Sequence, residues 1–554
     1  MLAVPALSSA QSPQQPAENI DQVRNTVLGL IRALVDQGVL TAAKAQEMLR
    51  QAGLDPALLS APQTTPAAPL AGSEPPKPVV RVPYVPEVVK DEIREQVKQE
   101  VLAQAKAEHW YEPGALPAWL SKIDVYGDML LRYQVDTFAS DNAALSAIDA
   151  VYQLPFGTTK NDTAANERLR LRARLGLNVR LSEEFNAGMR VVTVQGDDAT
   201  ASPISYPVQL GRFGRPMSAA FDLAFLQWKT PYDLQFNAGR IRNPYAPVTP
   251  LFGGGRAANP YIASDLIWAP ELTFDGIAAT WTPNYAEEWS GLLTLGAHPL
   301  RITAPSSIAN TSDNQWLFGA QAGTKWKGSD DSRLDLAASF YYFDHLEGEL
   351  NPANPPGNTL NSSTAPQFRQ LGNTMFNVNF LSAPNAAPVY AYASKFHLLD
   401  VSVDYQYTGF DPVWAWLRLD WVRNLGFDSA DIANRIGQQI VELPTDVSGA
   451  NGVHRARVTG YLGAFQFGSS KLDRFGDWQV FGGYRYLERD AVPDAFTSGD
   501  YRLGGTDSRS EFAGMNLGVS PAVSLTMRYV TSRSIDAVPR FAVDTWFLDL
   551  FGRF

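Results

Sequence analysis

The stretch from residue 167 to residue 181, ERLRLRARLGLNVRL, constrains the fold more than any other part of this chain, because arginine and leucine alternate along it. Successive side chains of a β-strand point to opposite faces of the sheet. One face would therefore be apolar, and the other would carry Arg168, Arg170, Arg172 and Arg174. Burying such a row in a dry core is costly, and facing it to lipid costs about 2–4 kcal/mol for each arginine at mid-depth. A water-filled lumen behind an apolar outer face avoids both costs.

Similar alternation recurs along the rest of the chain and predicts a series of strands. No stretch reaches the roughly 18 apolar residues that a membrane-spanning helix needs, so a membrane location would require strands closed into a barrel. The predicted strands cover residues 123–135, 166–181, 184–196, 219–230, 233–241, 271–282, 288–298, 314–327, 332–344, 396–408, 412–425, 453–467, 475–488, 508–519, 521–532 and 542–554. The strand at 233–241 fits less well, because Arg240 is in phase with apolar residues.

The connections between these strands alternate in length. Those after the even strands are short, and those after the odd strands are long, up to the segment 345–395. Outer-membrane barrels have short periplasmic turns and longer extracellular loops. The sequence therefore predicts an all-β membrane protein, with an antiparallel transmembrane β-barrel of about 16 strands over residues 121–554. A large soluble barrel or sandwich with one polar face is the alternative.

The first 120 residues have a different pattern and predict a short α-helical N-terminal region in the periplasm. Residues 1–12 resemble the end of a signal peptide, and residues 18–54 have helical spacing of apolar residues. A proline-rich linker follows at 55–86, and residues 87–120 predict an amphipathic or coiled-coil-like helix and turn. This last helix could trimerise or could lie solvated on the barrel; the pattern leaves both open.

Composition argues against several classes of function. The chain has no cysteine, which excludes disulfides and thiolate chemistry. Its formal net charge of -11 argues against nucleic acid as a partner. The five histidines are scattered without the spacing of metal ligands, so we predict neither a metal, nor a cofactor, nor an enzyme.

Two further stretches carry a family resemblance. Residues 110–134, WYEPGALPAWLSKIDVYGDMLLRYQ, combine a Pro-Gly turn with the opening of the first strand, and the last strand ends at Phe554 with Leu548 and Leu550 before it. Together these stretches resemble the putative-porin family of Gram-negative bacteria. The resemblance implies a homotrimeric outer-membrane porin in contact with lipid and lipopolysaccharide. It also implies that the barrel-insertion machinery reads Phe554 as an assembly signal.

The resemblance places a constriction loop at residues 242–270. General porins fold their third loop into the barrel, and Arg242, Tyr245, Arg256 and Asp265 are the candidate residues here. The triplet at 253–255 is glycine only, but no strand–helix context indicates a phosphate-binding loop.

Charges on the inward faces are predicted to lie on opposite walls of the lumen, and rows of charge tune the selectivity of a pore. The predicted lining consists of basic Arg132, Arg168, Arg170, Arg172, Arg174, Arg190, Arg455, Arg457, Arg485 and Arg528, and acidic Asp335, Asp400, Asp404 and Asp420.

We expect a wide pore for small hydrophilic solutes and ions with a mild anion preference. The alternative is that the arginines and acids pair and leave little selectivity. A second candidate function is a structural tether whose N-terminal helices reach toward peptidoglycan.

Overall fold

Each strand pairs with its neighbour along the chain until the last strand meets the first. β1 (Ile123–Phe138) pairs antiparallel with β2 (Asn166–Arg180) along one edge and with β19 (Ala542–Arg553) along the other. Both edges of β1 are hydrogen-bonded, so the sheet is closed. The computed structural model describes residues 120–142, 165–194, 203–211, 216–245, 266–302, 314–328, 332–353, 361–382, 389–436, 456–536 and 541–554.

Sixteen long strands build the barrel wall, and each corresponds to one predicted segment. The largest difference is at β15, which begins at Thr459 rather than at residue 453. A two-residue strand, β4 (Val208–Gln209), pairs with β2 beyond the end of β3. The other wall strands are β3 (Phe185–Val194), β5 (Ser218–Lys229), β6 (Leu234–Arg242), β7 (Thr273–Trp281), β8 (Trp289–Arg301), β9 (Gln315–Lys327), β10 (Ser332–Asp344), β13 (His397–Phe410), β14 (Val413–Asn424), β15 (Thr459–Ser469), β16 (Trp478–Leu487), β17 (Ser508–Ser520) and β18 (Val523–Ser534).

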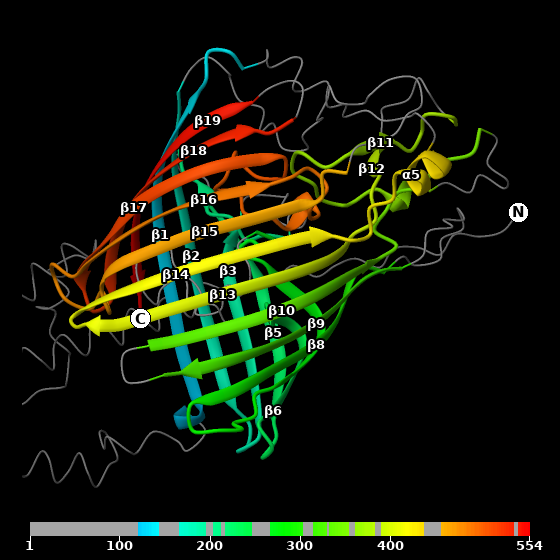
Figure 1. Ribbon diagram of the computed structural model, residues 1–554. Coiled ribbons are helices and arrows are strands. Elements are labelled where there is room, and N and C mark those ends of the chain that lie inside the picture. The colour runs from blue at the N-terminus through cyan, green and yellow to red at the C-terminus, as the bar shows by residue number, and fades with distance from the viewer. Residues whose placement is uncertain are drawn as a thin grey trace, which may run out of the picture. The chain divides into compact units, whose positions relative to one another are not determined.

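Most connections alternate in length, as predicted; one exception is the link from β15 to β16, which is no shorter than the link from β18 to β19. Short turns join β2 to β3, β5 to β6, β9 to β10, β13 to β14 and β17 to β18, whereas β6 to β7, β10 to β13, β14 to β15 and β16 to β17 are joined by long loops. The near-wall strands β13 to β17 run across the far-wall strands β1 to β3, as tilted strands of a closed barrel must (Figure 1).

The two faces of the wall differ as the sequence predicts. Leu175 is 53% exposed on the outer face, whereas Arg172, three residues earlier on the same strand, is only 1% exposed. The exception at Arg240 has a local explanation. It lies directly across from Asp275 on β7, and its Nε is 2.7 Å from Oδ1 of that carboxylate. The two charges form an exposed ion pair, so neither charge stands alone on the outer face.

Aromatic side chains cover glycines along the wall. The ring of Phe554 lies over Gly127 at the junction of β1 and β19, where an added Cβ would come within 2.5 Å of the ring. Backbone hydrogen bonds join the same two residues in both directions.

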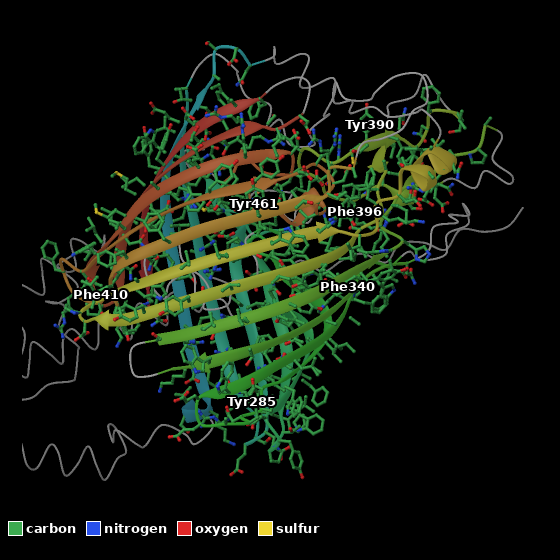
Figure 2. All side chains as sticks on the ribbon, viewed as in Figure 1. Tyr285, Phe340, Tyr390, Phe396, Phe410 and Tyr461 are labelled. Carbon is green, nitrogen blue, oxygen red and sulfur yellow. The ribbon has the colours of Figure 1, made fainter. Side chains whose placement is uncertain are left out.

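Figure 2 shows Phe410 at the turn end of β13, and Tyr390 and Phe396 near the opposite end of that strand. Phe410 is 57% exposed, as is typical of aromatic residues near the strand ends of a membrane barrel, whereas Phe396 is fully buried.

A small structure lies at the long-loop end of the barrel (Figure 1). β11 (Met375–Asn377) pairs with β12 (Tyr390–Tyr392), and the helix α5 (Ser429–Ile436) packs Ile432 and Ile436 into the same apolar cluster as Phe376. Three single 3-10 turns complete the described elements: η2 (Leu120–Lys122), η5 (Ser362–Thr364) and η7 (Asp494–Phe496). In the described ranges, no helix has the length and apolar character that crossing a membrane requires.

The predicted N-terminal segments at 1–12, 18–54, 55–86 and 87–120 lie outside the described residues, except that Leu120 begins η2. The helical region therefore stays a prediction.

A charge on the outer face tests the orientation of the wall. We expect Leu175→Arg to lower the free energy of unfolding in lipid vesicles by about 2–4 kcal/mol, because an arginine would then face hydrocarbon near mid-depth. The control is Leu181→Arg. Residue 181 lies beside the short turn, so this substitution should lower the free energy of unfolding by only about 0–1 kcal/mol. Denaturant unfolding followed by tryptophan fluorescence measures both. Equal losses for the two variants would contradict the assignment of the faces.

Candidate functional site

Most of the predicted basic residues face the inside of the barrel, and most of them meet a carboxylate there. Arg132 Nε lies 2.8 Å from Asp549 Oδ1, across the junction of β1 and β19. Arg190 Nη2 lies 2.8 Å from Asp222 Oδ2. Further pairs join Arg168 with Asp136, Arg172 with Glu271, Arg174 with Asp128, and Arg528 with Asp500. Charges buried inside a protein are stabilised by such charge-assisted hydrogen bonds.

The predicted acidic residues also face inward, but they do not form a purely acidic wall. Arg418 lies on β14 and places Nη2 3.2 Å from Asp404 Oδ2 on β13. Arg333 pairs with Asp335 on β10. Asp400 and Asp420 are 2% and 3% exposed. The part of the wall that carries most of the arginines, around β1, β2 and β3, has carboxylates as well, such as Asp222 on the adjacent β5. Among the described residues, arginines and acids therefore mix on both walls.

A loop that the sequence did not single out crosses the lumen. It joins β16 to β17, and we call its residues 496–500 the lumen bridge. At one end, the ring of Phe496 stacks on Phe343 of β10, with 5.9 Å between centroids. At the other end, Asp500 lies 2.8 Å from Arg132 on β1 and also pairs with Arg528 on β18. β1 and β10 are the first and ninth of sixteen wall strands, so the bridge joins opposite walls.

The charge of Asp500 depends on its two arginines. Burial alone would raise the pKa of this carboxyl, but Arg132 and Arg528 outweigh that effect and hold its pKa well below the usual range. A carboxyl with a lowered pKa stays ionised as the pH falls to moderately acid values. The contact of the bridge with β1 and β18 should therefore persist under those conditions.

Buried polar side chains join the loop that carries the bridge to the segment 361–382. The backbone N–H of Gln370 donates to Asp494 Oδ2 at 2.9 Å, and Tyr392 Oη donates to the other oxygen of that carboxylate. Asn373 Nδ2 donates to the carbonyl of Val492 at 2.8 Å. Burial raises the pKa of Asp494, although the hydrogen bonds from Tyr392 and Gln370 oppose the rise. The two loops thus form one packed unit.

The loop predicted to constrict the pore enters the same packed unit. Five residues of its described end are buried: Leu266, Ile267, Trp268, Ala269 and Leu272. The backbone N–H of Ala269 donates to the carbonyl of Phe496 at 2.7 Å. The indole of Trp268 packs on Tyr341 of β10, with 5.2 Å between centroids. This end therefore contacts the bridge. Arg256 and Asp265 lie outside the described residues.

The other two residues predicted for this loop hold it to the wall. Tyr245 is fully buried, and its hydroxyl lies 2.9 Å from His298 Nε2. His298 Nδ1 donates to the carbonyl of Asp275, so Nε2 accepts from the tyrosine hydroxyl. The guanidinium of Arg242 lies over the ring of Tyr126, 5.7 Å from its centroid. Tyr245 anchors the start of the loop.

The remaining predicted residues have other positions. Arg457 precedes β15 and lies 3.6 Å from Glu488 and 2.5 Å from Asp536, so it pairs at the loop end instead of on the wall. Arg485 lies over the ring of Tyr501 in the bridge's loop, 4.8 Å from its centroid. Arg455 lies outside the described residues. No group of three or more His, Asp and Glu side chains in the described ranges is arranged to hold a metal ion.

Comparisons with known proteins give one family match and several similar solved structures. A family model described as a putative porin matches residues 24–554. Among solved structures, OprB of Pseudomonas putida has a TM-score of 0.44 at 10% identity, covering 80% of this chain and 96% of its own. OmpF of Salmonella typhi, solved with daunomycin, has a TM-score of 0.41 at 10% identity, covering 78% and 97%. No curated protein matches the sequence.

Removing the carboxylate of the bridge should release it. We expect Asp500→Ala to increase the single-channel conductance and its fluctuations, because the bridge then loses both of its charged contacts with β1 and β18. Asp222→Ala is a matched control, since it removes a paired carboxylate from the wall but leaves the bridge attached. Planar-bilayer recording compares the two. Equal traces from both variants would show that Asp500 does not hold the bridge.

Proposed function

Because the chain belongs to the putative porin family, which together with its closed β-barrel makes it an outer-membrane channel, we propose that small hydrophilic solutes and ions diffuse passively through its lumen. The observation that carries this proposal is the difference between the two faces of the wall. The outer face presents leucine, phenylalanine and tryptophan, whereas the inner face is rich in arginine, aspartate, glutamine and serine. An ionic inner surface inside a membrane requires water or paired charge beside it.

We propose a narrow path for these solutes rather than the wide pore expected from the sequence. The lumen bridge joins opposite walls, and the segment from Leu266 to Leu272 packs beside it. Both occupy space that an unobstructed barrel of sixteen strands would leave to water. Small ions and small polar molecules then pass more easily than bulky solutes.

A mild anion preference is part of the proposal. The lumen-facing arginines of β1, β2, β3 and β18 create a positive local potential, but nearby carboxylates cancel most of it. Selectivity in channels follows the balance of charge lining the path. A small surplus of cations favours anions without excluding cations.

Assembly and position are proposed on the same basis. We propose a homotrimer in the outer membrane with the N-terminal region in the periplasm. Phe554 is 77% exposed at the junction of β1 and β19, where the insertion machinery could reach it. A tether to peptidoglycan would concern residues outside the described ranges and is compatible with a channel.

Recording from purified full-length protein in planar bilayers tests the channel and its selectivity. We expect discrete conductance steps and, in a tenfold potassium chloride gradient, a reversal potential displaced modestly toward that of chloride. The double variant Arg170→Ala, Arg172→Ala loses two positive charges. Its reversal potential should therefore move toward the equilibrium potential of potassium. Protein that inserts as a heat-modifiable barrel but never conducts would refute the channel, and a reversal potential near that of potassium would refute the anion preference.

A further inference from the structure

Arg170 differs from the other arginines of its wall. It lies in the middle of β2, is half-buried, and faces the lumen between Arg168 and Arg172. Among the described residues, no carboxylate lies within 4.0 Å of its guanidinium, and the side chain donates no hydrogen bond. An arginine has five N–H donors. With respect to the part of the chain that the structure describes, Arg170 therefore keeps its charge and its donors available toward the lumen.

The balance of charge around Arg170 leads to the same conclusion. Seven buried or half-buried arginines of β1, β2, β3 and β18 face this part of the lumen: Arg132, Arg168, Arg170, Arg172, Arg174, Arg190 and Arg528. Six carboxylates lie within ion-pair distance of one or more of them: Asp128, Asp136, Asp222, Glu271, Asp500 and Asp549. Each of the other six arginines has at least one of these partners. Within this set of seven described arginines, Arg170 alone has no carboxylate partner; Arg242 of β6, which also forms no ion pair with a described carboxylate, lies over the ring of Tyr126 instead.

The surroundings of Arg170 favour an anion that is small. Arg132 lies directly across from it on β1, and Gln209 lies across from it on β4. The same Arg132 pairs with Asp500, 2.8 Å from its Nη1. Because Asp500 belongs to the lumen bridge, Arg170 stands where the bridge meets the wall, on the path that solutes would take.

We infer that Arg170 is a binding subsite for the carboxylate of a small organic monoanion. A planar guanidinium matches a carboxylate with two parallel hydrogen bonds, which a spherical ion such as chloride cannot form. One surplus positive charge compensates one negative charge, so a monocarboxylate is favoured over a polyanion. Gln209, with its exposed side chain, could contact the polar remainder of the solute. This subsite rests on the proposed channel function, because a solute reaches it through the lumen.

Equilibrium binding of benzoate to the detergent-solubilised full chain tests the subsite, with benzamide as the neutral probe of the same shape. We expect saturable benzoate binding, no comparable benzamide binding, and roughly tenfold weaker benzoate binding in Arg170→Gln, as the loss of one charged bidentate contact implies. Arg170→Lys keeps the positive charge but loses the two parallel N–H donors of the guanidinium. Its affinity for benzoate should therefore fall between those of the wild-type chain and Arg170→Gln. Arg174→Gln is the matched variant. It removes an equal charge from the same face of β2, but from an arginine already paired with Asp128.

The outcomes separate the subsite from the channel. Equal weakening in Arg170→Gln and Arg174→Gln would show that only the general potential of the lumen attracts the anion, and would overturn the subsite. Absence of benzoate binding to the heat-modifiable wild-type barrel would also overturn it. Because binding is measured without current, a barrel that binds benzoate through Arg170 but does not conduct refutes the proposed channel alone. Partial block of single-channel current by benzoate, relieved in Arg170→Gln, would support both.

Discussion

The closure of the sheet at β1 and β19 is the contact on which the rest of the structure depends. In lipid, no water satisfies an unpaired backbone group, so a sheet with a free edge is not stable there. Pairing along both edges of β1 removes that edge. Once the sheet is closed, its alternating side chains must face either lipid or the interior, and the register at the junction decides which residues meet. Arg132 is placed opposite both Asp549 and Arg170 by this register.

The interior then has to accommodate many charges. Isolated buried charges are strongly unfavourable, and the wall reduces this cost by pairing arginines with carboxylates of neighbouring strands. Asp222 on β5 pairs with Arg190 of the neighbouring β3, and Asp549 on β19 pairs with Arg132 of the neighbouring β1. Asp500 does the same from a loop, and its pairing therefore also fixes the position of the bridge. One set of ion pairs thus neutralises the wall and shapes the path of solutes.

The strands could be predicted because their signal is local. The alternation in 167–181 and the short turns fix the faces and the strand order without knowledge of distant contacts, and β2 appears as predicted. The partners of the charges could not be predicted in the same way. Nothing local in the sequence shows that Asp500, in a long loop, reaches Arg132 and Arg528 on other strands. The constriction is likewise predicted only for the loop at 242–270, because no pattern distinguishes the loop after β16 from its neighbours.

The register at β1 and β19 tests the account most directly. The chain has no cysteine, so a pair of introduced cysteines reports one contact without competition. Leu131 and Leu550 face each other across the junction. Oxidation of the double variant Leu131→Cys, Leu550→Cys, folded in lipid vesicles, should form an intramolecular disulfide in most molecules, whereas Leu131→Cys with Leu548→Cys should form little. Absence of the first cross-link, or equal yields from both pairs, would show that the sheet does not close in this register and would contradict the account.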